Sequence, residues 1–204
     1  MLITLRRCSA TTYTLASFKD GLIVALTISP RPYIAQRAVA YSKYGIAIVQ
    51  GLSSRGLAEK IAFKLVNGPE EAITEVLLSD KKAPYRQALA ISVDGDWYAF
   101  TGFGTVEEKG HGKCGNVVYA GNGLKSGSLK LACSADEDPV FSVLQAALKI
   151  ERRGNLWPSR SASLLIWNNG EAKLFSVNLS EDPLFELITK ARSYLLKRKS
   201  ARYL

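Results

Sequence analysis

A threonine at the head of the first predicted strand is the residue of this sequence best equipped to act as a nucleophile. Residues 11–18 (TTYTLASF) combine threonines with aromatic residues, a composition typical of β-strands. A threonine freed at a chain terminus carries its own base. The α-amine, with a pKa of roughly 7.7–8.0, is partly neutral at physiological pH and can accept the hydroxyl proton. Nothing else in the sequence offers a comparably complete nucleophile.

The composition indicates one folded domain outside the membrane. Hydrophobic residues make up 47% and charged residues 22% of the 204 positions, which allows a substantial core. The longest apolar stretches, such as residues 22–28 and 164–167, are far shorter than the roughly 18 residues that cross a bilayer. Arg6 and Arg7 interrupt the only apolar run near the N-terminus. We therefore expect a cytoplasmic protein with no membrane partner.

The cysteines favour neither a disulfide scaffold nor a metal site. Cys8, Cys114 and Cys133 are few and widely spaced, and with His111 as the only histidine they match no zinc-binding pattern. We expect no metal and no other cofactor. Cys114 and Cys133 would pair in a hyperthermophile, whereas a buried or idle thiol is the commoner fate. Cys8 adjoins two arginines that would lower its thiol pKa, but it precedes the first strand and we treat it as incidental.

The net charge of +9 raises the question of an anionic partner. Much of the excess lies at the end of a predicted C-terminal helix, in Lys190, Arg192, Lys197, Arg198, Lys199 and Arg202. Cations there also complement the helix dipole and keep the tail in solution. Because no zinc finger, base-stacking strand or phosphate-binding glycine loop accompanies them, we expect no nucleic-acid partner.

Turn and periodicity signals predict hairpins and helices along the whole chain. Asp-Gly or Asn-Gly pairs separate three pairs of strands, 13–18 from 22–28, 87–93 from 96–101, and 163–167 from 172–177. Further strands are predicted at 45–50 and 116–120. Apolar spacing predicts a helix over 55–66, which Asn67-Gly68-Pro69 separates from the next. Acidic residues before Pro139 and Pro183 open two later helices.

Two antiparallel sheets covered by helices, a four-layer αββα sandwich of the α+β class, bury all of these faces at once. A two-layer α+β fold is the alternative. We expect a single domain over residues 12–204 with a basic C-terminal helix end. Residues 1–11 are then an N-terminal extension or a propeptide.

A series of short motifs, each weak alone, resembles a known family in its order and spacing. The motifs are TYTLA at 12–16, YGIAIVQ at 44–50, SRGL at 54–57, YRQ at 85–87, FTG at 100–102, GH at 110–111 and GN at 121–122. They occur in the order found in the domain of unknown function 1028 family, which looks like a branch of the N-terminal-nucleophile (Ntn) hydrolases. The resemblance implies the αββα sandwich and an amide-hydrolase site.

The same resemblance implies a set of site residues. Thr12 matches the leading threonine and becomes the nucleophile, while His111 and Asn122 match the Gly-His and Gly-Asn positions and become further catalytic candidates. Gln50 matches a strand-end glutamine and becomes a substrate-binding candidate. Each also has a structural interpretation: Thr12 as a strand former, His111 as a solvated loop residue, Asn122 as a turn former and Gln50 as a framework residue.

The chain departs from the family pattern in one late segment. Where the family has Gly-Asp-x-Arg-Gly-x-Gln-Ser-Ala, residues 154–162 read GNLWPSRSA. Ser161 and Ala162 remain, and Arg160 stands at the glutamine position; Arg160 and Ser161 are the substrate-binding candidates of this segment. The lost acidic residue, arginine and glutamine imply a changed substrate or a lost activity.

These observations lead to two hypotheses. In the first, the protein is an Ntn-type hydrolase of a small-molecule or peptide amide, in which the freed amine of Thr12 is the base. Backbone amides, helped by Asn122, would hold the oxyanion. In the second, it is a non-catalytic binding or assembly protein with the same fold. A homo-oligomer is compatible with both.

Overall fold

The computed structural model describes residues 11–201, with the side chains of residues 11–197. Cys8 and the rest of the 1–10 segment, together with the side chains of Arg198, Lys199 and Arg202, lie outside the described residues. In the described part, no helix is both long and apolar enough to span a membrane. The same residues contain no cluster of three potential metal ligands.

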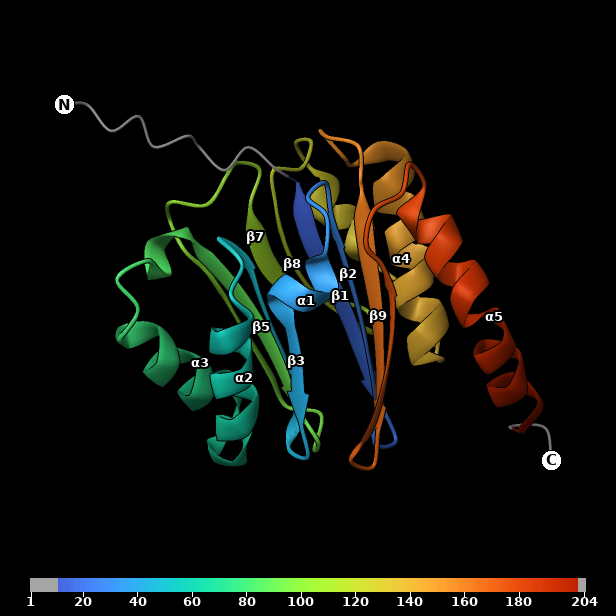
Figure 1. Ribbon diagram of the computed structural model, residues 1–204, viewed down its shortest axis with the longest axis horizontal. Helices are drawn as coiled ribbons and strands as arrows, with labels where there is room; N and C mark the ends of the chain where they lie inside the picture. The colour runs from blue at the N-terminus through green and yellow to red at the C-terminus, as the bar shows by residue number, and fades with distance from the viewer. Residues whose placement is uncertain (1–10, 202–204) are drawn as a thin grey trace.

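Two antiparallel sheets form the centre of the molecule (Figure 1). The larger sheet has the order β10-β9-β2-β1-β8-β7. Its strands are β1 (Thr12–Lys19), β2 (Leu22–Ser29), β7 (Gly110–Cys114), β8 (Val117–Asn122), β9 (Ser161–Asn168) and β10 (Glu171–Val177). The smaller sheet has the order β3-β4-β5-β6. Its strands are β3 (Val39–Ser42), β4 (Gly45–Gly51), β5 (Arg86–Ser92) and β6 (Trp97–Thr101). The α+β class is confirmed.

Helices pack on the outer face of each sheet (Figure 1). On the smaller sheet lie α2 (Arg55–Lys64) and α3 (Pro69–Leu78), and on the larger sheet lie α4 (Pro139–Arg153) and α5 (Pro183–Ala201). The short α1 (Ile34–Ala38) follows β2 and contacts both β2 and β9. Short 3-10 helices cover Leu65–Asn67, Ala83–Tyr85 and Ser128–Ala132.

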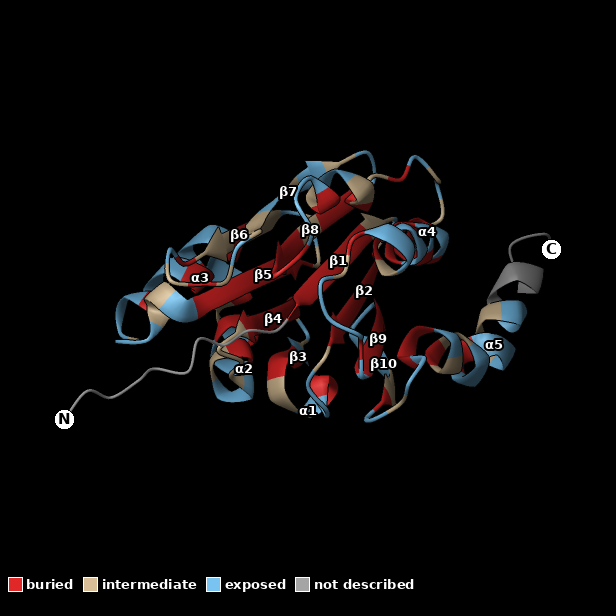
Figure 2. Ribbon diagram, turned by 90° about the horizontal axis from the view of Figure 1, so that it is seen from above, coloured by how far each residue is buried: buried red, intermediate tan, exposed pale blue. Residues whose placement is uncertain are grey.

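Three apolar cores follow from this arrangement, and the buried strands occupy the middle of the molecule (Figure 2). One core joins the larger sheet to α4 and α5, and another joins the smaller sheet to α2 and α3. The third contains residues of both sheets, including Ile23 and Leu165 from the larger and Ile48 and Leu89 from the smaller. The two sheets therefore pack face to face.

The predicted hairpins and helix starts are confirmed, with one difference of turn type. Asp20-Gly21 and Asn169-Gly170 each place both residues at positive φ, as a two-residue hairpin turn requires. At Asp94-Gly95 only the glycine has positive φ, because the turn is one residue longer and places Gly95 in the bulge position. Asp138 caps α4 by accepting from the amide nitrogen of Val140 at 2.8 Å.

Two expectations about the segment near residue 111 need correction. His111 was expected in a loop, but it lies in β7, and its flanking glycines serve close packing: a Cβ at Gly112 would lie 2.9 Å from the Tyr119 hydroxyl. Cys114 and Cys133 are not idle thiols, because they form a disulfide. Backbone pairing of residues 115 and 116 with Ser134 brings the two cysteines together across 19 positions of sequence.

Candidate functional site

At one end of the molecule, the layer between the sheets changes from apolar to polar. Along β2, the inward positions Ile23 and Ala25 are followed by Thr27 and Ser29. Along β1 the polar inward positions come first and the apolar ones follow. The order is reversed because, in an antiparallel pair, the start of one strand lies beside the end of the other. Side chains two apart share a face of a strand, so these hydroxyl groups enter the layer between the sheets.

A first row of polar side chains crosses the larger sheet at this end. It consists of Ser161 in β9, Ser29 in β2, Thr12 in β1 and Asn122 in β8. Registers pair Ser29 with Ser161 and Thr12 with Asn122, and the Thr12 and Ser29 hydroxyl oxygens are 3.3 Å apart. The row brings two of the predicted catalytic residues, Thr12 and Asn122, onto neighbouring strands.

A second row lies one step further into the molecule. Thr14 pairs with Thr27 on one side and with Ala120 on the other, and Ala120 pairs in turn with His111 of β7. The Thr14 and Thr27 hydroxyl oxygens are 3.0 Å apart. Because this row ends at His111, the only histidine lies on the edge strand and is not paired with Thr12.

Two buried glutamines of the smaller sheet connect it to these rows. Gln50 and Gln87 are register partners on β4 and β5, and both are at most 1% exposed. The Gln50 amide donates to Gln87 Oε1 at 2.7 Å and to the Ala120 carbonyl at 2.9 Å, and Gln50 Oε1 accepts from the Thr14 hydroxyl at 2.8 Å. Both polar atoms of the Gln50 side chain therefore form hydrogen bonds within the network.

Gln87 is the most connected of the network residues that the sequence analysis did not name as site candidates. Its Oε1 accepts from Gln50 and, at 3.0 Å, from the Asn122 side-chain amide. Its own amide nitrogen lies 2.8 Å from Thr101 Oγ1 and 2.9 Å from the Gly121 carbonyl. The signal was present in the sequence: a glutamine precedes Leu89 and Ile91 at the same alternating positions, where a buried face would otherwise be apolar.

Thr12 is buried and still linked to the residue before it. Its residue exposure is 5%, and its carbonyl oxygen lies 3.4 Å from Asn122 Nδ2 and 3.5 Å from Gln50 Nε2. Thr11, 2% exposed, donates a hydrogen bond from its hydroxyl to the Gly123 carbonyl. The amide nitrogen of Thr12 has no lone pair available to take a proton. In the uncleaved chain, the nitrogen that would serve as base is therefore blocked.

Asn122 ends a strand and does not form the turn after it. The residue is 2% exposed, and it is Gly123 that has the positive φ of 67°. Its amide can therefore act as a fixed donor beside Thr12.

His111 contacts the network through one neighbour. Its Nδ1 lies 2.9 Å from Thr101 Oγ1, and Thr101 in turn accepts from Gln87. The residue is exposed, yet partial burial of the imidazole lowers its pKa from the ordinary 6.5. At neutral pH the ring is neutral, which suits proton exchange with a hydroxyl group.

The two late candidates, Arg160 and Ser161, border the first row. Ser161 is fully buried, and its hydroxyl donates to the Arg31 carbonyl at 2.5 Å and accepts from the Ile34 amide at 3.3 Å. Arg160 is exposed, and its backbone nitrogen donates to the Ser29 carbonyl at 2.9 Å. Both residues therefore fix the β2–α1 connection, and within the described part of the chain neither side chain forms a hydrogen bond with Thr12.

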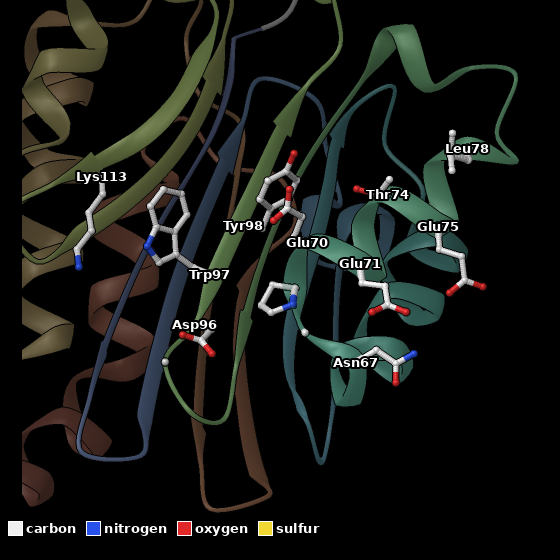
Figure 3. Close-up of a pocket in the computed structure, with 13 residues that line it drawn as sticks. Asn67, Glu70, Glu71, Thr74, Glu75, Leu78, Asp96, Trp97, Tyr98 and Lys113 are labelled. Carbon is white, nitrogen blue, oxygen red and sulfur yellow. The ribbon is translucent and has the colours of Figure 1, made fainter.

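A large surface groove lies elsewhere, between α3 and β6 (Figure 3). It has a volume of about 1050 Å³ and shares no residue with the polar rows. Glu70 and Glu71 of α3 line one side of it, and Trp97 and Tyr98 of β6 line the other, with Glu70 beside Tyr98. None of the residues that line this groove is a predicted site residue, whereas the polar rows contain Thr12 and Asn122, so the polar rows are the better candidate for a reactive site.

Comparison with solved structures shows the same fold in another protein. The crystal structure of a Silicibacter pomeroyi protein, described as belonging to the family DUF1028, matches with a TM-score of 0.79 and 19% sequence identity. The match covers 90% of this chain and 85% of that one. At this identity, the likeness concerns the fold.

No curated protein matches the sequence. The model of one family, described as a family of unknown function (DUF1028), matches residues 23–187. This span is most of the chain and includes every strand of both sheets except β1 and the first residue of β2. The protein therefore belongs to the family DUF1028.

Proposed function

We propose that this protein is an N-terminal-nucleophile amide hydrolase, in which Thr12 becomes the first residue of the mature chain. The two facing sheets with helices outside them support an αββα sandwich of that type. One observation carries the proposal: Thr12 is the first residue of a central strand and lies in a row of buried polar groups beside Asn122. A nucleophile needs such a fixed position and nearby donors.

The proposed reaction uses the freed α-amine as general base. The amine takes the Thr12 hydroxyl proton as the oxygen bonds to the carbonyl carbon of an amide, and backbone amides and Asn122 Nδ2 stabilise the oxyanion. Collapse of this intermediate breaks the C–N bond, and the leaving amine takes the proton from the ammonium group. Water, deprotonated by the same amine, then hydrolyses the ester and restores Thr12.

The first test is the mass and N-terminal sequence of the protein from its natural source. The proposal expects a chain that begins at Thr12. Thr12→Ala should remain uncleaved and inactive, and Thr12→Ser should retain part of both processing and activity, since serine keeps the hydroxyl group. A protein purified in full yield with Met1 or Leu2 at its N-terminus would exclude the threonine mechanism.

The second candidate function is a non-catalytic binding or assembly protein, as a monomer or a homo-oligomer. The hydrogen bond from Thr11 to Gly123 favours it, because this bond holds the residue before Thr12 inside the fold. The same N-terminal sequencing separates the two functions. An uncleaved chain that still binds a small amide would support the second.

The cellular location stays a prediction. We expected the cytoplasm, where thiols are kept reduced. The Cys114–Cys133 disulfide argues for a more oxidising compartment or for an organism with intracellular disulfides.

A further inference from the structure

We propose that the loop joining β2 to α1 forms a binding subsite for a substrate carboxylate, made by the side chains of Arg31 and Arg37. The inference rests on the proposed function in one respect, since it assigns that hydrolase an anionic amide as substrate. The subsite itself can be tested without any hydrolysis.

The loop begins beside the proposed nucleophile. Ser29 Oγ lies 3.3 Å from Thr12 Oγ1 and also accepts a hydrogen bond of 3.1 Å from the Arg31 backbone nitrogen. One serine side chain therefore contacts both the nucleophile and the residue that would bind the anion. A substrate held by its carboxylate at this loop would have its amide near Thr12.

The backbone of the loop is fixed at several points. Pro30 and Pro32 flank Arg31 and restrict φ on both sides of it. The Arg31 carbonyl accepts from Ser161 Oγ at 2.5 Å and from Arg37 Nη2 at 3.3 Å. These bonds use only the Arg31 backbone, so its exposed side chain is left to reach a ligand. A preformed loop lowers the entropy lost when a ligand binds.

Arg37 presents its guanidinium in a fixed orientation. Its Nε donates to the Pro32 carbonyl at 2.8 Å, and its Nη1 donates to Ser53 Oγ at 3.1 Å. With the bond to Arg31, three of its five N–H groups have partners, which leaves one on each terminal nitrogen. Two N–H groups on neighbouring nitrogens are the arrangement that binds a carboxylate through both oxygens.

Two positive charges lie close together here without a negative one. Burial and the charge of Arg31 together lower the pKa of the Arg37 guanidinium. Within residues 11–197, neither arginine forms an ion pair. Arg86, which begins β5 at the same end of the sheets, is paired with Asp80 at 2.8 Å. A bound anion would supply the charge that Arg31 and Arg37 lack.

Arg160 extends the positive charge along the same edge. It is exposed, and its backbone nitrogen donates to the Ser29 carbonyl at 2.9 Å. Its backbone therefore lies beside the start of the loop, and its side chain forms no ion pair in the described part of the chain. Arg31, Arg37 and Arg160 are all positively charged, and this charge favours anionic over neutral ligands at this end of the molecule.

The test compares N-acetylglycine with its neutral counterpart N-acetylglycinamide, both titrated into the purified full chain and followed by backbone amide NMR. We expect N-acetylglycine to shift the signals of residues 29–37 in a saturable way, and the neutral amide to shift them little. Arg37→Gln should weaken N-acetylglycine binding about tenfold or more, as expected for the loss of hydrogen bonds to a charged group.

Two further variants separate binding from folding. Arg31→Gln leaves the loop-fixing bonds intact, because they use its backbone, and should also weaken binding by several-fold. Arg192→Gln makes the same charge change on α5, which packs on the outer face of the larger sheet, and should leave binding unchanged. Equal binding of the two ligands, or unchanged binding in both loop variants, would overturn the subsite.

The outcome is independent of catalysis. Specific N-acetylglycine binding by a chain that never loses residues 1–11 supports the subsite and removes the hydrolase. Cleavage of neutral amides in preference to carboxylate-bearing ones by a chain that begins at Thr12 supports the hydrolase and removes the subsite.

Discussion

Gln87 is the residue on which most of the polar layer depends. Its Oε1 accepts from both Gln50 and Asn122, so one buried oxygen satisfies two donors from two different sheets. A buried donor without an acceptor costs about 1–3 kcal/mol. The position of the Asn122 amide beside Thr12 therefore depends on a residue of the opposite sheet.

Replacing this glutamine should expose that dependence. Gln87→Leu leaves the Gln50 and Asn122 amides without their shared acceptor and should lower the free energy of unfolding by more than about 2 kcal/mol. Urea denaturation measures the change. Gln36→Leu is the matched control, because Gln36 is exposed and its amide bonds only to Asn178. Equal stability of the two variants would contradict the network.

The pKa of His111 offers a second test at this scale. Because it is the only histidine of the sequence, its ring protons can be assigned in an NMR titration without variants. Partial burial should hold the pKa below 6.5. The folded state then binds fewer protons than the unfolded one, so the stability contributed by the neutral ring is present above pH 6.5 and declines as the pH falls below it.

A variant without the imidazole ring provides the control for the histidine prediction. His111→Gln cannot titrate in this range, so its unfolding free energy should change less between pH 7 and pH 5 than that of the wild type. A measured pKa at or above 6.5 would show that the ring is as solvated as a free histidine.

At the scale of elements, the turns of the hairpins control how the strands meet. Gly95 and Gly170 both have a φ of 87°, but their surroundings differ. A Cβ at Gly95 would lie 2.4 Å from the Phe18 ring, whereas a Cβ at Gly170 would meet nothing within 4 Å. The first glycine is needed for both conformation and space, and the second for conformation alone.

Alanine substitutions should therefore differ in cost. Gly170→Ala should destabilise the protein by about 1–2 kcal/mol, the cost of a left-handed residue, and Gly95→Ala should cost more because the Phe18 ring must move. Gly56→Ala in α2 is the control, since no atom lies near its Cβ and alanine favours helix by about 1 kcal/mol. Thermal unfolding measures all three, and a reversed order would contradict the turn assignments.

The disulfide is an element-scale constraint on the site. Cys114 ends β7, the strand of His111, and Cys133 follows the 3-10 helix Ser128–Ala132. The loop that it closes contains β8 and therefore Asn122. The crosslink thus restricts the strand that carries the proposed oxyanion donor.

At the scale of the whole molecule, positive charge is spread over several surfaces. The net charge is +9, and Arg31, Arg37 and Arg160 contribute to it at the end of the sheets, far along the chain from the basic helix end. On α5, Lys190 is paired with Glu186 at 2.9 Å, so part of that charge is locally balanced. The total charge therefore does not identify a nucleic-acid surface.

A salt titration tests this conclusion. A protein that neutralises six phosphates loses affinity for duplex DNA steeply with salt, with a slope of about −0.9 per contact. We expect no sub-micromolar binding of duplex DNA at physiological salt in a filter-binding assay. Tight binding that is abolished by replacing Lys197, Arg198 and Lys199 with alanine would show that the helix end is a nucleic-acid site.

Most hairpins and long helices of this protein were predictable from local sequence, whereas α1, β3 and β7 were not. Asn169-Gly170 favours the φ values of a tight hairpin turn, and Asp138 before Pro139 favours a capped helix start, whatever the rest of the chain does. Runs of strand-forming residues beside these turns likewise predicted the paired strands, since β-branched and aromatic side chains fit the surface of a sheet. These features depend on neighbours in the chain, which the sequence records directly.

The assembly of the site was decided by tertiary structure. Thr12 and Asn122 are 110 positions apart and meet only because β1 and β8 pair, and Gln87 reaches them from the other sheet. His111 looked like a loop residue because glycines flank it, but pairing with β8 makes that segment a strand. The Cys114–Cys133 bond has the same origin. Contacts between distant segments depend on strand order and sheet packing, which no local pattern of residues specifies.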